Sequence, residues 1–367
     1  MPASSLHGVR ILEVGGIGPA PFAGMLLAGM GADVVRVDRP GGGALGAALE
    51  APNAALDRGK RRIRLDLKDP ADLAALLALA AEADVLVEGY RPGVAERLGF
   101  GPDACHARNP ALVFARMTGW GQDGPRAAEA GHDINYIGLT GALDAIGEAE
   151  GSPAVPLNLV GDFGGGALYL VVGILCALRD AERHGEGCVI DAAIVDGVAH
   201  LATYVHALRN SGGWTGRRGA NLLDGGAPFY TTYATADGRR MAVGAIEPRF
   251  YRALLSTLGV DLDPAAQHDE RVWPLARARL AAAFARRTRA EWSERFAGVD
   301  ACVTPVLSFG EAADDPHLRH RGTLVDDGAG ALPAPAPRRA GAGAAAAAPL
   351  PREDADRDAV VTDWCGG

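Results

Sequence analysis

The sequence predicts an α/β fold, in which a large domain built on a parallel β-sheet is followed by a smaller α+β domain. Two patterns predict this architecture. The first forty residues have the order strand, glycine turn, helix, strand, which is the order of a βαβ unit in a parallel sheet. Farther along, two β-prone runs on either side of residues 236–239 predict an antiparallel hairpin that is followed by helices. The chain has 367 residues, enough for two or three domains.

The composition excludes several classes of protein. The net charge is -9, so nucleic acid is not expected as the main partner. The five cysteines are scattered without a CxxC pair, which argues against a disulfide framework and a metal site and favours a reducing cytoplasmic location. The N-terminus lacks a charged region followed by an apolar one, so we expect no signal peptide.

The opening βαβ unit lacks the full signature of a dinucleotide site. Its strands are predicted at residues 9–14 and 32–38, with a helix at residues 22–31 between them. The turn contains Gly16 and Gly18 but not the third glycine of the fingerprint at its usual place. NAD or FAD is therefore not expected.

A loop is predicted for residues 41–55, and a basic run follows it. Six cations fall within the eleven residues from Arg58 to Lys68. One interpretation is an edge strand that is kept soluble by its charge. The other is a phosphate-binding surface, because guanidinium groups bind phosphate oxygens bidentately. The residues alone leave both interpretations open.

The next strand is expected to end close to a ligand. It begins at residue 83 and leads into a turn that ends at residue 93. Ligands of open parallel sheets bind at the carboxyl ends of the strands, so Tyr90, Arg91 and the later Arg97 are placed to contact one. The other elements predicted nearby are a helix at residues 69–83 and strands at residues 112–117 and 188–194.

Residues 131–166 carry the strongest chemical pattern, because His132 and Asp162 lie among glycines that let the backbone approach a ligand. The apolar run 164–178 predicts a buried helix. Asp162 then has two interpretations that are compatible with each other. It is an N-cap of that helix, or it is a carboxyl group beside helix-start amides that stabilise an anion. Residues 159–178 resemble a membrane span, but Asp162 and five glycines favour a core helix, so no membrane span is expected.

The remainder of the chain predicts the smaller domain and a return to the first. The predicted parts are a large domain at 1–208, a linker at 209–225, a small α+β domain at 226–325, an Ala/Pro/Gly-rich linker at 326–351 and a C-terminal segment at 352–367. Within the small domain we expect helices from Glu247 and over residues 273–296. Residues 353–367 are expected to pack back as a terminal helix.

Several motifs in this order resemble the α-methylacyl-CoA racemases, a branch of the family III CoA-transferase superfamily. They are GPAP at 18–21, GADVVRVDRP at 31–40, GYRPG at 89–93, GHDINY at 131–136, NLVGDFGGG at 158–166 and GAIEP at 244–248. The resemblance runs from about Leu6 to Trp364. It implies an obligate interlocked homodimer, a Rossmann-like large domain that contains both the N-terminal part and the C-terminal end, and active sites formed between subunits.

The resemblance also implies a reaction and its residues. Such enzymes interconvert the R and S forms of a 2-methylacyl-CoA thioester through an enolate, and coenzyme A is carried as part of the substrate without any other cofactor. His132 and Asp162 match the two acid/base groups, Glu247 matches a glutamate that hydrogen-bonds the histidine, and Asn158 matches a residue that lines the site. The amides at the start of the Asp162 helix are the expected donors to the enolate oxygen.

A further set of residues is implied to bind coenzyme A, and its cations are expected to contact the phosphates. The set is Ile17, Arg39, Leu67, Lys68, Gly89, Tyr90, Arg91, Arg97, Asp133 and Tyr136.

Two alternatives remain. In CoA-transferases of the same superfamily, the aspartate that matches Asp162 is a nucleophile that forms anhydride and thioester intermediates. His132 distinguishes the two activities, because a transferase needs no second proton-transfer group. The other alternative is a non-catalytic protein that binds coenzyme A.

Overall fold

The computed structural model describes residues 5–41, 54–326, 330–338, 340 and 354–366. Its contacts divide the chain into two compact units. The first contains Met1–Thr140, Leu157–Ala202 and Pro316–Gly367, and the second contains Gly141–Pro156 and Thr203–Asp315. Each unit is described by itself below. The predicted α/β fold is confirmed.

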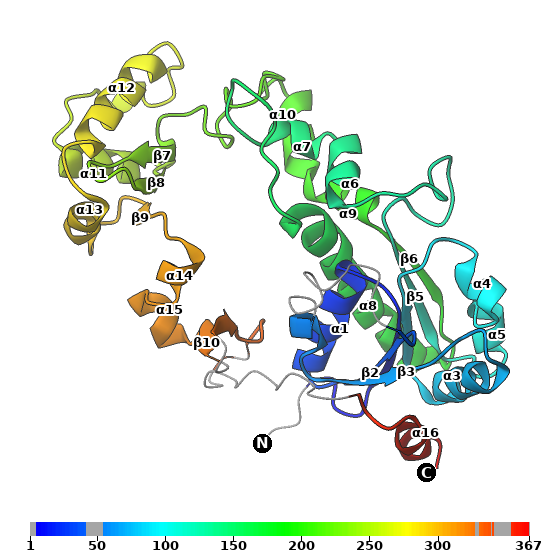
Figure 1. Ribbon diagram of the computed structural model, residues 1–367. Helices are drawn as coiled ribbons and strands as arrows, with labels where there is room; N and C mark the ends of the chain where they lie inside the picture. The colour runs from blue at the N-terminus through cyan, green and yellow to red at the C-terminus, as the bar shows by residue number, and fades with distance from the viewer. Residues whose placement is uncertain (1–4, 42–53, 327–329, 339, 341–353, 367) are drawn as a thin grey trace. The chain divides into compact units, whose positions relative to one another are not determined.

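The first unit contains a six-stranded parallel sheet with the order β3-β2-β1-β4-β5-β6 (Figure 1). The strands are β1 (Arg10–Val14), β2 (Asp33–Asp38), β3 (Lys60–Arg64), β4 (Val85–Glu88), β5 (Val113–Thr118) and β6 (Val189–Ala193). In the register, Val14 lies beside Glu88, and Glu88 lies beside Arg116. The chain leaves β1 towards β2 on one side, whereas β4 lies on the other, so the loops after β1 and β4 diverge and leave room for a ligand.

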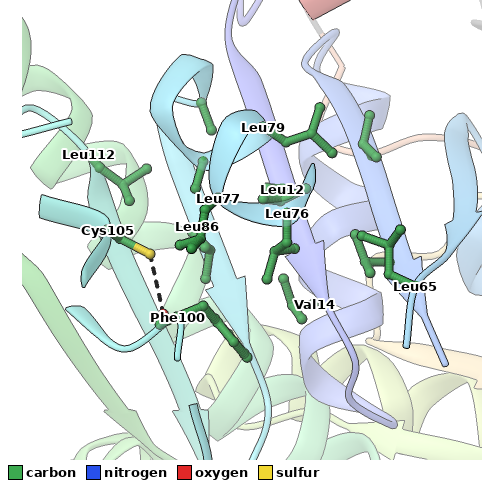
Figure 2. Close-up of a cluster of buried hydrophobic side chains, with 14 of the residues drawn as sticks. Leu12, Val14, Leu65, Leu76, Leu77, Leu79, Leu86, Phe100, Cys105 and Leu112 are labelled. Atoms are coloured by element: carbon green, nitrogen blue, oxygen red, sulfur yellow. Dashed lines mark hydrogen bonds between the residues drawn. The ribbon is translucent and has the colours of Figure 1, made fainter. Parts of the chain in front are cut away.

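One face of this sheet is covered by α3 (Pro70–Glu82) and α5 (Pro102–His106), together with α16 (Arg357–Cys365) near the C-terminus. Alternate residues of β1, Leu12 and Val14, point into this cluster, as the two-residue period of a strand requires. Figure 2 shows the cluster, including the bond from the Cys105 thiol to the Phe100 carbonyl.

The predicted terminal helix is confirmed as α16. Its Val360 and Trp364 are buried in the same cluster, and the Trp364 indole donates a hydrogen bond to the Asp33 carboxylate at 2.8 Å. The two ends of the chain therefore belong to one hydrophobic core.

The other face of the sheet carries α1 (Pro19–Gly29), η2 (Leu159–Ala167), α8 (Leu168–His184) and α9 (Ile194–Leu201). The predicted helix 164–178 is present but begins earlier, since η2 is a π-helical segment that leads directly into α8. By length and composition alone, Leu159–His184 could cross a membrane, a property that core helices of soluble proteins share. Leu170, Val171, Ile174 and Ala177 of α8 are buried within the unit.

The second unit contains a three-stranded antiparallel sheet with the order β7-β8-β9. Its elements include β7 (Tyr230–Ala234), β8 (Arg240–Gly244), β9 (Val303–Pro305), α10 (Thr203–Asn210), α11 (Pro248–Leu258), α12 (Trp273–Phe284) and α13 (Arg289–Phe296). The hairpin and the helix after Glu247 are confirmed. The helical structure predicted over 273–296 is present as two helices, because Thr288 caps a new helix with a capping box to Glu291.

Part of the predicted Ala/Pro/Gly linker has regular structure. Strand β11 (Ala331–Pro333) pairs antiparallel with β10 (Leu324–Asp326). Other parts of this linker, at 327–329, 339 and 341–353, lie outside the described residues, as do residues 42–53 of the predicted loop. At the first linker, Arg209 and Asn210 belong to α10 instead of a loop.

Candidate active site

A cavity of about 860 Å³ lies at the carboxyl ends of β1, β4 and β5, within the first unit. Its walls come from the loops that follow these strands and from the starts of α6 (Asp133–Leu139) and η2. Eight of the residues predicted for the site line it: Ile17, Arg39, Gly89, Tyr90, Arg91, His132, Tyr136 and Asp162. The loops of an open parallel sheet are thus the place where the sequence motifs meet.

The loop after β1 lets Asp162 approach closely. Gly15, Gly16 and Gly18 all have positive φ angles, which favour glycine. At Gly18 an added Cβ would lie 2.9 Å from Oδ2 of Asp162, so a side chain there would displace the carboxylate. Stacking of the Phe22 and Phe163 rings, with centroids 4.4 Å apart, holds the start of α1 against η2.

The loop after β4 is held by a buried carboxyl group. Glu88 ends the strand, and its Oε2 accepts the Tyr90 amide hydrogen at 2.7 Å. Burial raises the pKa of Glu88 to about 7, although the Tyr90 bond and the nearby Arg116 lower it. The backbone of Tyr90 and Arg91 therefore has a fixed direction where the chain enters the cavity wall.

His132 is the N-cap residue of α6, and its amide donates to Oδ1 of Asn135 at 3.0 Å. Aromatic packing supports this corner, since the Trp120 and Tyr136 rings meet edge to face with centroids 4.7 Å apart. The Tyr136 hydroxyl also donates to the Gly131 carbonyl. The helix start is thereby fixed at the point where the imidazole reaches the cavity wall.

Asp162 lies inside the first turn of η2, so the interpretation of Asp162 as an N-cap is wrong; Asn158 holds that position. Burial, followed by the charge of Asp133, raises the pKa of Asp162 to about 6. Two weaker influences lower it: a long hydrogen bond from the Asn158 amide, at 3.4 Å, and the charge of His132. His132 and Asp162, the two predicted acid/base groups, both line the larger cavity.

The amide of Asp162 is already occupied. Oδ2 of Asp133 accepts the Asp162 amide hydrogen at 2.7 Å. The helix-start interpretation expected this amide to be available to an enolate oxygen, but a carboxylate already holds it. Among the hydrogen bonds of the described residues, none engages the amides of Asp133 and Ile134, the first two residues of α6. Helix-start amides of this kind point along the axis and stabilise negative charge.

A second cavity of about 310 Å³ is lined by Arg39, Leu67, Lys68 and Tyr90. Arg39 and Tyr90 also line the larger cavity, so the two adjoin. Together they bring ten of the predicted residues to one surface. Arg97 and Asn158 line neither cavity, and the Asp133 carboxylate is buried behind the wall. Glu247 is an exposed N-cap residue of the second unit, so its predicted bond to His132 stays a prediction.

The basic run is confirmed as an edge strand, β3. Lys60 is fully buried and pairs with Glu13 at 2.6 Å, and Arg62 and Arg64 both bind the Asp354 carboxylate. Arg62 and Arg64 also line the larger cavity. Phosphate binding by this run remains a prediction, and carboxylates already accompany several of its cations.

Comparison with known proteins gives these residues a family. The family model described as CoA-transferase family III matches residues 6–355. The chain belongs to CoA-transferase family III. It is 47% identical to mouse α-methylacyl-CoA racemase and 46% identical to the human enzyme, over 88% of this chain and 83% and 82% of theirs. A crystal structure of a CAIB/BAIF family protein from Brucella suis has the same fold, with a TM-score of 0.82 at 24% identity, covering 98% of this chain and 99% of that one.

Three features of this family III site were missed by the sequence analysis. They are the occupation of the Asp162 amide by Asp133, the bond from Glu88 to the Tyr90 amide, and the packing of Trp120 on Tyr136. A signal existed for the first, because Gly161 directly precedes Asp162 and glycine permits close approach. Metal ions have no evident place, since no group of three or more potential ligands among His, Cys, Asp and Glu occurs in the described part of the chain.

Replacing Asp162 by Asn is expected to change how stability depends on pH. Because the folded pKa is raised from 3.8 to about 6, the folded state binds a proton more tightly than the unfolded state. The stability due to this proton is fully present below about pH 4 and lost as the pH rises through about 6. The difference in the free energy of unfolding between Asp162→Asn and the parent should therefore shift in favour of the variant as the pH rises from 4 to 7. Above pH 7 this difference should stay constant. Urea unfolding across this range measures it, and parallel stability curves for the two proteins contradict it.

Proposed function

We propose that this family III protein interconverts the R and S forms of a 2-methylacyl-CoA thioester. The observation that carries the proposal is the placement of His132 and Asp162 on the wall of one cavity. The names of the mouse and human relatives support the same reaction.

The proposed chemistry uses one group on each face of the α-carbon. One of the two side chains removes the α-proton as a base, and the electron pair moves into the thioester carbonyl to form an enolate. The other side chain then donates a proton to the opposite face, and the configuration inverts. A carboxyl group with a pKa of about 6 is suited to both directions near neutral pH, because it is readily protonated and deprotonated.

The enolate oxygen needs donors that do not have to reorganise. We assign this role to the first amides of α6, at Asp133 and Ile134, because the amide of Asp162 already binds a carboxylate. The helix dipole adds partial positive charge at the same place. Loss of one donor of this type costs on the order of 3 kcal/mol in other enzymes.

The coenzyme A part is proposed to extend over both cavities. Tyr90 and Arg91 follow β4 at the larger cavity, and Arg39 and Lys68 bring cations to the smaller one. These cations suit the phosphates of a coenzyme A thioester. No cofactor besides the coenzyme A of the substrate is proposed.

An interlocked homodimer is also proposed, with the partner's small domain as a source of Glu247. Leu168, Val172 and Cys176 repeat every four residues along α8 and are all exposed, which makes one face of this helix apolar and open. Leu201 of α9 extends the apolar surface, since an added Cβ at Gly164 would lie 3.4 Å from its Cδ1. A surface of this kind is typical of one that a partner covers.

The activity is tested by incubating an (R)-2-methylacyl-CoA in deuterium oxide. We expect exchange of the α-proton with solvent and epimerisation without an acceptor acid. His132→Ala and Asp162→Ala should each slow the exchange by about 10² to 10⁴-fold, as general acid/base groups do elsewhere. A strict requirement for a carboxylate acceptor would favour a CoA-transferase with Asp162 as nucleophile. Exchange at the parent rate in both variants, or none in the parent, would favour mere binding.

The place of coenzyme A is tested with two thioesters of the same acid. Lys68→Ala should raise the KM of the CoA thioester by about 10 to 100-fold, the value of one charged hydrogen bond. The KM of the matching pantetheine thioester, which has no nucleotide, should not change. Arg108→Ala serves as the control, because the guanidinium of this exposed arginine donates to the nearby Ala104 carbonyl and lines neither cavity. Equal effects of Lys68→Ala on both thioesters would contradict the assignment.

The homodimer is tested by sedimentation velocity. The expected mass is twice the 37.8 kDa of one chain. Val172→Arg should weaken association because it places a charge in the apolar face, whereas Ala71→Arg on exposed α3 should not. If Val172→Arg does not fold, the mass of the parent protein still tests the homodimer. A mass of one chain at micromolar concentration refutes the proposal.

A further inference from the structure

The Asp133 carboxylate connects the two chain segments that carry the acid/base groups. Asp133 is the first residue of α6 and follows His132 directly. Its Oδ2 accepts the Asp162 amide hydrogen at 2.7 Å and passes close to Gly161. One side chain thus joins the backbone beside the imidazole to the backbone of the other acid/base residue, 29 positions later.

The surrounding structure leaves no space for a side chain at position 161, beside this contact. An added Cβ at Gly161 would lie 2.3 Å from Oδ2 of Asp133 and 3.0 Å from Cγ2 of Ile137. Any residue with a side chain at 161 would therefore push α6 and η2 apart. The absence of a side chain at Gly161 is what permits the carboxylate oxygen to reach the Asp162 amide.

The contact has an energetic cost that packing alone does not explain. Asp133 is buried, and its second oxygen, Oδ1, has no hydrogen-bond partner in the described part of the chain. Burying a carboxylate with an unsatisfied oxygen is unfavourable. The carboxylate also lies next to the like charge of Asp162. An apolar residue would fill the same space at lower cost.

We propose that Asp133 is a positioning residue: its carboxylate holds the backbone of Asp162 against the helix that carries His132 and so sets the separation of the two acid/base groups. This inference rests on the proposed racemisation. It differs from the role that the family resemblance gives to Asp133, which is contact with coenzyme A. Both acid/base groups must reach one carbon from opposite sides, so an error of about 1 Å in their separation can slow the reaction by about 10²-fold.

The same carboxylate has an electrostatic effect on Asp162. The ionisable groups that influence Asp162 are Asp133, His132 and Tyr136, and the neutral Asn158 amide also bonds to it. Burial raises the pKa of Asp162 most, and among these groups Asp133 is the one whose negative charge raises it further. Removal of that charge should make Asp162 a stronger acid.

Two variants separate the effects. Asp133→Ala removes the acceptor and the charge, whereas Asp133→Asn keeps an oxygen that can accept the Asp162 amide hydrogen and removes only the charge. In Asp133→Ala we expect faster hydrogen–deuterium exchange at the Asp162 amide and a kcat about 10²-fold lower, with KM within about threefold of the parent. In Asp133→Asn we expect that amide to stay protected and the acid limb of the kcat/KM profile to move to lower pH. Asp123→Ala, in an exposed loop, is the control.

Several outcomes would overturn the inference. They are a parent-like kcat in Asp133→Ala, a raised KM with unchanged kcat, which means contact with coenzyme A, and unchanged exchange of the Asp162 amide. If Asp133→Ala does not fold, the acid limb of Asp133→Asn decides, and an unshifted limb counts against the inference. Amide exchange is measured without substrate. A parent that racemises no 2-methylacyl thioester therefore refutes the proposed function, while the amide data still judge the contact.

Discussion

The candidate active site depends on one contact, the hydrogen bond that the Asp162 amide donates to the Asp133 carboxylate. Without it, the start of α6 and the first turn of η2 are connected through the chain only by the intervening residues 141–156, which belong to the other unit. The hydrogen bonds of a sheet fix the positions of its strand ends. His132 and Asp162, however, lie on helices beyond those ends. A direct bond between the helix starts supplies the precision that the sheet does not.

Glycine makes this arrangement possible in two different ways. At Gly18 and Gly161 the missing Cβ lets a carboxylate oxygen approach the backbone closely. At Gly165 and Gly197 it lets η2 and α9 pack backbone to backbone, since an added Cβ at Gly197 would lie 1.9 Å from the Gly165 carbonyl oxygen. The π-helical turn thus has support on both sides, which suits its position, because widened turns of this kind occur often at functional sites.

Local patterns in the sequence were sufficient to predict the sheet. Strands such as β1, β4 and β5 are short apolar runs that indicate their own burial, whereas the basic strand β3 was one of two open interpretations of its segment. Motif positions were likewise sufficient to place His132, Asp162 and most of the coenzyme A residues, because they follow strands whose carboxyl ends must share an edge. The contacts that could not be predicted are those between residues far apart in the sequence. Nothing near Arg62 or Arg64 indicates that Asp354, about 290 residues away, binds them.

The helix start at Asp162 could not be predicted for a related reason. Asp is a common N-cap, and a run of glycines gives no sign that the helix has already begun. Whether an amide is free or occupied is decided by tertiary contacts, and here the occupant, Asp133, comes from another helix. The sequence indicated two side chains that line one cavity, but not that the Asp162 amide is already occupied. Side-chain identity carries the first kind of information, whereas the second exists only in three dimensions.

The raised pKa of Asp162 has a consequence for a reaction whose substrate and product are mirror images at one carbon. Such a reaction runs equally well in both directions, so neither acid/base group can be much stronger than the other without slowing one of the two proton transfers. A free aspartic acid titrates near 3.9, so its carboxylate is a weak base at neutral pH. Burial and the charge of Asp133 raise the pKa of Asp162 to about 6, which makes its carboxylate a stronger base and keeps its acid form accessible near neutral pH. The costly burial of two neighbouring carboxyl groups therefore suits the proposed reaction, because one side chain must both accept and return a proton.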